Sequence, residues 1–113
     1  MRYRILAAGE LIGESDLEGC DPVLHLAYGQ FHPAPAYEAV RPVFRSVSEG
    51  QGVGDPEALA TCYRARDGLN LALHDDSGRE VLTGWIQIVD LSAHLGGCAY
   101  QVEAQVEDAT FFR

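Results

Sequence analysis

The sequence contains no lysine and only one asparagine among its 113 residues. All eight basic side chains are arginines, and seventeen acidic side chains oppose them, which gives a net charge of −9. A chain with this balance repels phosphate groups, so we expect no direct binding to nucleic acid. We interpret the missing lysine and the scarce asparagine as codon bias in a GC-rich bacterial genome.

A long apolar run is also missing, because no stretch approaches the roughly 18 apolar residues that would cross a membrane. The apolar run after Arg4 stops at Gly9, and it is shorter than the roughly 7–15 residues of a signal-peptide core. We therefore expect a cytoplasmic protein that is neither exported nor embedded in a membrane.

Cysteine is scarce, since Cys20, Cys62 and Cys98 are an odd number of thiols without a CxxC pair. Disulfide-stabilised proteins use even and denser sets, so we expect reduced cysteines that are buried as small apolar side chains. No two of the four histidines have the close spacing of zinc ligands, and no serine lies in a GxSxG motif. These absences predict a protein without a metal, a cofactor or a catalytic residue, and so not an enzyme.

What the chain does have is enough apolar material, 47% of its residues, for the core of one domain spanning 1–113. Two short apolar runs, Arg2–Ala7 and Leu11–Glu14, flank a glycine and predict a hairpin. Residues 14–21 are polar and predict a loop. The run Val23–Phe31 predicts a strand whose two faces are both mostly apolar.

A helix is predicted from Pro35 to about Val47, because apolar residues recur on one face at helical spacing. These residues are Tyr37, Val40, Phe44 and Val47. Pro42 lacks the N–H that the helix needs, so we expect a kink or a split near Arg41.

The next segment, residues 49–54, is rich in glycine and predicts a flexible loop. Asp55 and Pro56 then suit the cap and first position of a second helix that ends near Tyr63. Residues 57–64 are also compatible with a strand, and the sequence leaves this alternative open.

The C-terminal half predicts three strands. Residues 69–74 and 81–89 form a hairpin around an Asp/Ser/Gly turn, and Tyr100–Glu107 alternates apolar with polar residues. The last six residues predict a short helix that docks Phe111 and Phe112. Together these elements predict an α+β fold in which an antiparallel β-sheet is covered on one face by one or two helices.

An acidic segment is the strongest candidate for a binding site. Five acids and no base lie between residues 10 and 21, and such a segment steers a basic partner toward its site. The residues predicted to bind the partner are Glu14, Asp16, Glu18 and Asp21. We expect Tyr28 and Trp85 to be core residues, although an exposed Trp85 would serve as an interface anchor.

Two stretches, GELIGESDLEGCDP and YGQFHPAPAYEAVRP, cover most of residues 9–42, and GWIQIVDLS lies in a later strand. With them the chain resembles small acidic bacterial immunity proteins that are encoded beside toxins. The resemblance implies a protein-binding inhibitor that neutralises a toxin by occluding its active or binding surface. Acidity, small size and the missing catalytic motifs agree with this hypothesis.

Two alternatives belong to other functional classes. The first is a small enzyme or ligand-binding protein with a pocket near His25 and His32. The second is a structural module that self-associates, for example as a homodimer, by pairing the polar strand Gln101–Glu107 or another sheet edge between subunits.

Overall fold

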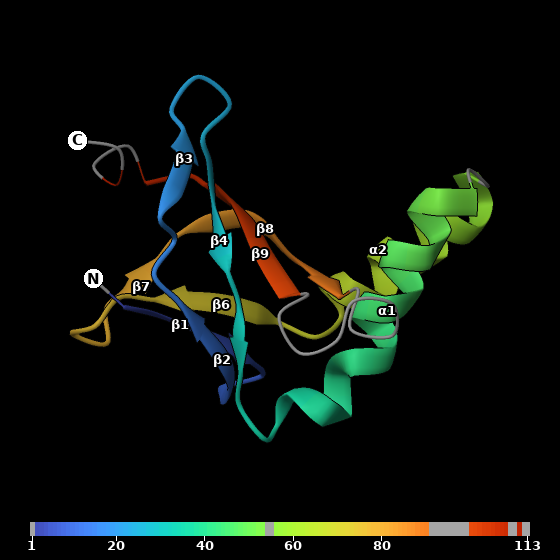
Figure 1. The fold of residues 1–113 in the computed structure, drawn as a ribbon, viewed down its shortest axis with the longest axis horizontal. Helices are drawn as coiled ribbons and strands as arrows, with labels where there is room; N and C mark the ends of the chain where they lie inside the picture. Colours follow the sequence, from blue (N-terminus) through green and yellow to red (C-terminus); the bar gives the residue numbers. More distant parts are fainter. Residues whose placement is uncertain (1, 54–55, 91–99, 109–110, 112–113) are drawn as a thin grey trace.

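The computed structural model describes residues 2–53, 56–90, 100–108 and 111, and of residues 48–53 it describes the backbone alone. These residues form two antiparallel sheets and two helices (Figure 1). Sheet A has the strand order β5-β2-β1-β6-β7, and sheet B has the order β3-β4-β9-β8. The predicted α+β class is confirmed, but the single sheet is wrong, because its strands divide between two sheets.

The bounds of the elements are as follows. Sheet A consists of β1 (Tyr3–Ala7), β2 (Glu10–Ser15), β5 (His32–Pro33), β6 (Leu71–His74) and β7 (Glu80–Val81). Sheet B consists of β3 (Gly19–Asp21), β4 (Leu26–Gln30), β8 (Thr83–Asp90) and β9 (Tyr100–Val106). The helices are α1 (Tyr37–Val53) and α2 (Pro56–Asp67), which contact each other, and α1 also packs against β8 and β2.

The two predicted hairpins have different outcomes. The first is confirmed, because β1 pairs antiparallel with β2. The second forms only where β6 meets the short strand β7, and beyond Leu82 the chain leaves sheet A and pairs with β9. This pairing sets the buried Ile86 and Ile88 against buried residues of β9. Both sheets thereby bury their alternate apolar residues in one core.

An aromatic cluster joins the two sheets to α1. Tyr37 stacks on Phe44 with 6.0 Å between ring centroids, and it lies 5.3 Å from Phe31 and 5.7 Å from Tyr100. Such ring pairs add about 0.5–1.5 kcal/mol each beyond the area that they bury. The predicted apolar face of this helix is confirmed, because Tyr37, Phe44 and Val47 are fully buried.

The middle of the chain is more helical than predicted. α1 runs through Pro42 to Val53, so the split near Arg41 and the loop at 49–53 are both wrong. The missing N–H of Pro42 removes one hydrogen bond, but the buried Tyr37 and Phe44 hold the turns on either side. α2 starts at Pro56 as predicted and continues past Tyr63 to Asp67, which excludes the strand alternative. Residues 54 and 55 lie outside the described part of the chain.

The strand predicted at Val23–Phe31 is shorter, and only one of its faces is buried. An Asp21 side-chain oxygen accepts the backbone N–H groups of Val23 at 3.0 Å and Leu24 at 3.2 Å. This turn replaces the first residues of the strand, so β4 starts at Leu26. The predicted loop 14–21 is wrong at both ends, since β2 reaches Ser15 and β3 occupies Gly19–Asp21.

The alternation predicted for the last strand is confirmed. Val102, Ala104 and Val106 of β9 are fully buried, and the polar residues between them face outward. After β9, Phe111 docks on Tyr3 with 5.5 Å between ring centroids, while Phe112 and residues 109, 110 and 113 of the predicted final helix lie outside the described residues. Among the helices described, none is long and apolar enough to cross a membrane.

Candidate functional site

The solvent-facing side of sheet B, which we call the outer face, carries aromatic, acidic and amide side chains in register. Tyr28 of β4 pairs with Glu103 of β9, which pairs in turn with Gln87 of β8. Side chains paired in this way stand about 4.5–5.5 Å apart at their Cβ atoms. The outer face includes Leu26, Tyr28, Gln30, Trp85, Gln87, Val89, Gln101, Glu103 and Gln105, and of these Gln87 is buried beneath Arg66 of α2.

A β-bulge at Gly84 places Trp85 on the outer face. Thr83 pairs with the inward-facing Val106, and Trp85 pairs with the next residue of β9, Gln105, so Gly84 is the extra residue. One extra residue moves the side chains that follow to the other face of a sheet. A Cβ atom at Gly84 would meet the Gln105 side-chain oxygen at 2.5 Å, so only glycine fits here without a shift.

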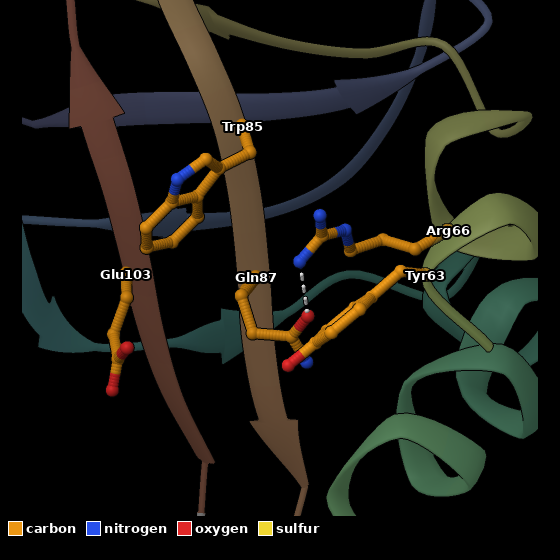
Figure 2. Close-up of a pocket in the computed structure, with 5 residues that line it drawn as sticks. All are labelled: Tyr63, Arg66, Trp85, Gln87 and Glu103. Carbon is orange, nitrogen blue, oxygen red and sulfur yellow. Dashed lines mark hydrogen bonds between the residues drawn. The ribbon is translucent and has the colours of Figure 1, made fainter. Parts of the chain in front are cut away.

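A hollow of about 320 Å³, which we call the α2 hollow, lies between the outer face and α2. Figure 2 shows its five lining residues: Tyr63 and Arg66 reach from α2 toward β8, where Arg66 meets Gln87, and Trp85 and Glu103 lie beyond. Trp85 is half-buried, so the prediction that it belongs to the core is wrong. The alternative role of an accessible anchor stays open for it.

Arg66 ties α2 to sheet B. Its Nη1 donates to Gln87 Oε1 at 2.9 Å, and its Nε and Nη2 donate to Asp67 Oδ1 at 3.3 and 3.2 Å. The guanidinium carbon lies 4.7 Å from the Tyr63 ring centroid and 5.8 Å from that of Trp85. With its charge paired and its side chain almost fully buried, Arg66 acts as a fixed wall of the hollow.

A second hollow of about 420 Å³, the β3 hollow, lies at the other end of the outer face. Its lining includes Glu18, Tyr28, Gln30 and Tyr100. Tyr28 is 40% exposed, so the prediction that it is a core residue is wrong. Its ring lies on Gly19, where a Cβ atom would overlap it, and the paired strand β3 therefore fixes the ring at the surface.

Of the four acids predicted to bind a partner, Glu14 lies on β2 of sheet A, Asp16 and Glu18 lie in the segment between β2 and β3, and Asp21 lies on the edge strand β3 of sheet B. Glu14 and Asp16 both pair with Arg2, at 3.5 and 3.4 Å. Glu18 accepts the Gln30 N–H at 3.0 Å, and this hydrogen bond lowers the pKa of its carboxyl below the usual value. Of the four, Glu18 alone lines either of the two hollows, while Asp21 holds the turn before β4.

That turn forms the tip of the β3–β4 hairpin, which projects from the body of the fold at the top of Figure 1. Val23 is 87% exposed and Leu24 is 59% exposed there. These two exposed aliphatic side chains lie next to Asp21, the last residue of the acidic segment.

The histidines predicted to form a pocket do not converge. His25 and His32 lie beyond opposite ends of β4, which separates them by about 20 Å at the rise of an extended chain. Both are exposed, and neither lines the α2 hollow or the β3 hollow. In the described part of the chain, no three histidine, cysteine or acidic side chains gather as a metal site would require.

The cysteines differ from the prediction in part. Cys20 is an exposed free thiol on β3, so its predicted burial is wrong, and Cys62 on α2 is partly buried. Cys98 lies outside the described residues.

A buried polar cluster lies at the end of β8. The Asp90 side chain is fully buried, and its Oδ2 accepts the Tyr37 hydroxyl at 2.6 Å. The Nε atoms of Arg41 and Arg45 lie 3.6 and 3.9 Å from the same oxygen. Arg41 also donates to the Tyr100 hydroxyl at 2.7 Å. The cluster joins α1 to β8 and β9, and a role in stability accounts for each of these contacts.

Alkaline pH is expected to destabilise the protein through this cluster. Burial, and then the hydrogen bond to Asp90, raise the pKa of Tyr37 far above its usual value of about 10. The stability linked to this phenol is therefore fully present below about pH 10 and falls above it, where only the unfolded chain ionises. Since the sequence has no lysine, tyrosine and cysteine are the side chains that titrate between about pH 8 and 11.

Urea unfolding between pH 8 and 11 measures this effect. Tyr37→Phe should reduce the loss of unfolding free energy above pH 10 without abolishing it, because burial also raises the pKa of Tyr3. Identical pH slopes for Tyr37→Phe and the wild-type protein would contradict the assignment.

Comparison of the chain with models of protein families, with curated proteins and with solved structures finds no match.

The sequence pattern located part of the outer face. The alternation in Tyr100–Glu107 predicts a solvated side that contains Glu103, and the sequence predicts an interface anchor at Trp85 if its face is exposed. Tyr63 and Arg66 were missed as site residues, because only the packing of α2 brings them to Trp85. The strand β9 lies inside sheet B with a partner on each side, so the self-association predicted through Gln101–Glu107 is wrong for that strand.

Proposed function

We propose that this protein is a cytoplasmic inhibitor of another protein, of the immunity type, which neutralises a bacterial toxin by covering its active or binding surface. It covers that surface with the outer face of sheet B and the neighbouring β3–β4 hairpin. The proposal includes no catalytic residue and no cofactor, so inhibition is stoichiometric.

The observation that carries this proposal is the composition of the outer face. Tyr28 and Trp85 are accessible on one hydrogen-bonded sheet, and a hollow lies beside each of them. Tyrosine and tryptophan are enriched among the residues that dominate binding energy, and such residues pair with pockets on the partner. A sheet holds them in place, so little conformational entropy is lost when a partner docks.

The charge of the chain favours a basic partner. The net charge is −9, and Glu103 and Glu18 present carboxylates beside the accessible rings. Complementary charge accelerates association and fixes orientation more than it adds affinity. The acidic segment that ends at Asp21 extends this charge along the edge of the sheet.

Capture from a lysate of the native organism tests the proposal. The wild-type protein and a Tyr28→Ala/Trp85→Ala double variant are used as bait at low and high salt, with mass spectrometry of the retained proteins. The expected result is one stoichiometric basic protein that the wild type retains, that the double variant loses and that high salt weakens. Equal retention by both baits would remove the outer face from the interface.

The acidic segment is expected to act on the rate of association. Replacing Glu14 and Asp16 by lysine should slow binding to the captured partner about tenfold at low salt, with a smaller effect at physiological salt. Glu18 and Asp21 also hold backbone groups, so their charge is tested with Glu18→Gln and Asp21→Asn.

Stopped-flow kinetics measures this change. A matched control, Asp76→Lys with Glu80→Lys, makes the same change of net charge near the turn between β6 and β7. An unchanged association rate for all four acidic positions, or an equal effect of the control pair, would exclude these residues from the docking site.

A further inference from the structure

We infer that the α2 hollow receives an arginine side chain of the partner protein, whose guanidinium stacks on Trp85 and donates to the carboxylate of Glu103. This inference rests on the proposed function and adds the chemistry of the contact. It predicts that the partner carries an exposed arginine at the centre of the surface that is covered.

The carboxylate of Glu103 is available for such a contact. It accepts one hydrogen bond, from Gln101 Nε2 at 3.3 Å, which is long for a charged acceptor. Within the described part of the chain, Glu103 takes part in none of the ion pairs. Its side chain lies at the wall of the hollow formed by β9, beyond Trp85 as seen from α2 (Figure 2).

Arg66 is not available in the same way, which argues against an anionic occupant. Its guanidinium already donates to Gln87 and Asp67, and it stacks on Tyr63. Arg66 is only 9% exposed, whereas the Asp67 carboxylate that pairs with it is 66% exposed. The net charge of −9 likewise raises the local concentration of cations.

The rings select a flat cation. A guanidinium is planar, stacks on an aromatic face and forms two parallel hydrogen bonds to one carboxylate. Arg66 itself lies over Tyr63 and near Trp85, so a guanidinium already packs against aromatic rings in the wall of this hollow. A lysine ammonium would reach Glu103 but would not stack in this way.

Fluorescence of Trp85 tests the inference directly, because it is the one tryptophan of the chain. The probe is acetyl-Gly-Arg-Gly-amide, titrated into the protein at low salt. A matched peptide with citrulline in place of arginine has nearly the same shape without the charge. We expect a saturable change in the millimolar range for the arginine peptide and at least about tenfold weaker binding of the citrulline peptide.

Two variants complete the experiment. Glu103→Gln removes the charge from a partly exposed side chain and should lower the affinity for the arginine peptide at least about tenfold. Glu103→Asp keeps the charge on a side chain that is one methylene shorter, so we expect a smaller loss of affinity. Glu80→Gln on β7 is the matched control and should leave binding within about twofold. Thermal melts verify that each variant is folded.

The inference is overturned by equal binding of the arginine and citrulline peptides, by unchanged binding to Glu103→Gln, by the absence of a saturable change, or by a response to inorganic phosphate instead. Its failure is distinct from that of the proposed function. If the arginine peptide does not bind while a partner still depends on Tyr28, the arginine site is contradicted and the proposed inhibitor function is not. If the peptide binds while no partner depends on the outer face, the α2 hollow binds arginine but the proposed inhibitor function is contradicted.

Discussion

Replacing Asp90 with alanine is expected to lower the free energy of unfolding by about 3 kcal/mol, in the range found when one partner of a buried ion pair is removed. The variant leaves the buried Tyr37 hydroxyl without its acceptor, which alone costs about 1–3 kcal/mol. It also removes the negative charge that compensates the positive charges of Arg41 and Arg45. Both arginines are partly exposed and can turn toward water, so the loss stays near the lower end of the range.

A second variant separates the hydrogen bond from the charge. Asp90→Asn keeps an oxygen that can accept the Tyr37 hydroxyl but removes the negative charge, so we expect about half of the loss. The matched control is Asp76→Asn, an exposed position in the turn after β6, which should change stability by less than about 0.5 kcal/mol. Urea unfolding measures all three, and a loss below about 1 kcal/mol for Asp90→Ala would contradict a structural role of the cluster.

The largest effect on binding is expected at the two accessible aromatic residues of sheet B. Tyr28→Ala and Trp85→Ala should each weaken the complex with the captured partner by about 30-fold or more, which corresponds to roughly 2 kcal/mol per residue. The dissociation rate should account for most of the change, because truncated anchors leave the encounter between charged surfaces intact.

The control for these variants is an exposed apolar residue of the other sheet. Leu11 of β2 is 36% exposed, and Leu11→Ala should leave the affinity within about threefold. Surface plasmon resonance gives the rates, and unfolding in urea shows whether Trp85→Ala keeps its fold after losing the contact with Arg66. Full affinity in both aromatic variants, with Leu11→Ala as the damaging change, would move the interface to sheet A.

Local patterns in the sequence predicted the elements whose buried face is set by near neighbours. The alternation of Val102, Ala104 and Val106 located β9, and the helical spacing of Tyr37 and Phe44 located α1. Each pattern repeats within one element, so no distant residue is needed to interpret it.

The division of the strands into two sheets is not a local property. The run 81–89 is mostly apolar and predicts one strand, yet Val81 pairs with β6 and Ile86 pairs with β9. That choice depends on how the whole core is filled. Proline and glycine likewise suggested breaks at Pro42 and at 49–53, but the backbone stays helical through both, and around Pro42 the burial of Tyr37 and Phe44 offsets the low helix propensity of proline.

The candidate site could be predicted from the sequence only in part. The acidic segment was visible as composition, but its carboxylates also serve the fold, since Glu14 and Asp16 pair with Arg2. The α2 hollow combines side chains from α2, β8 and β9, and the bulge at Gly84 decides where Trp85 points. Such a combination depends on tertiary packing, which neither periodicity nor spacing reports.

Growth rescue by co-expression is the most direct test of the proposed inhibition through the outer face. The captured partner is expressed in a bacterial host alone, with the wild-type protein, with the Tyr28→Ala/Trp85→Ala double variant, and with Leu11→Ala. We expect the partner alone to arrest growth, the wild type and Leu11→Ala to restore it, and the folded double variant to fail. Growth restored equally by the double variant, or no rescue by the wild-type protein, would contradict inhibition through this surface.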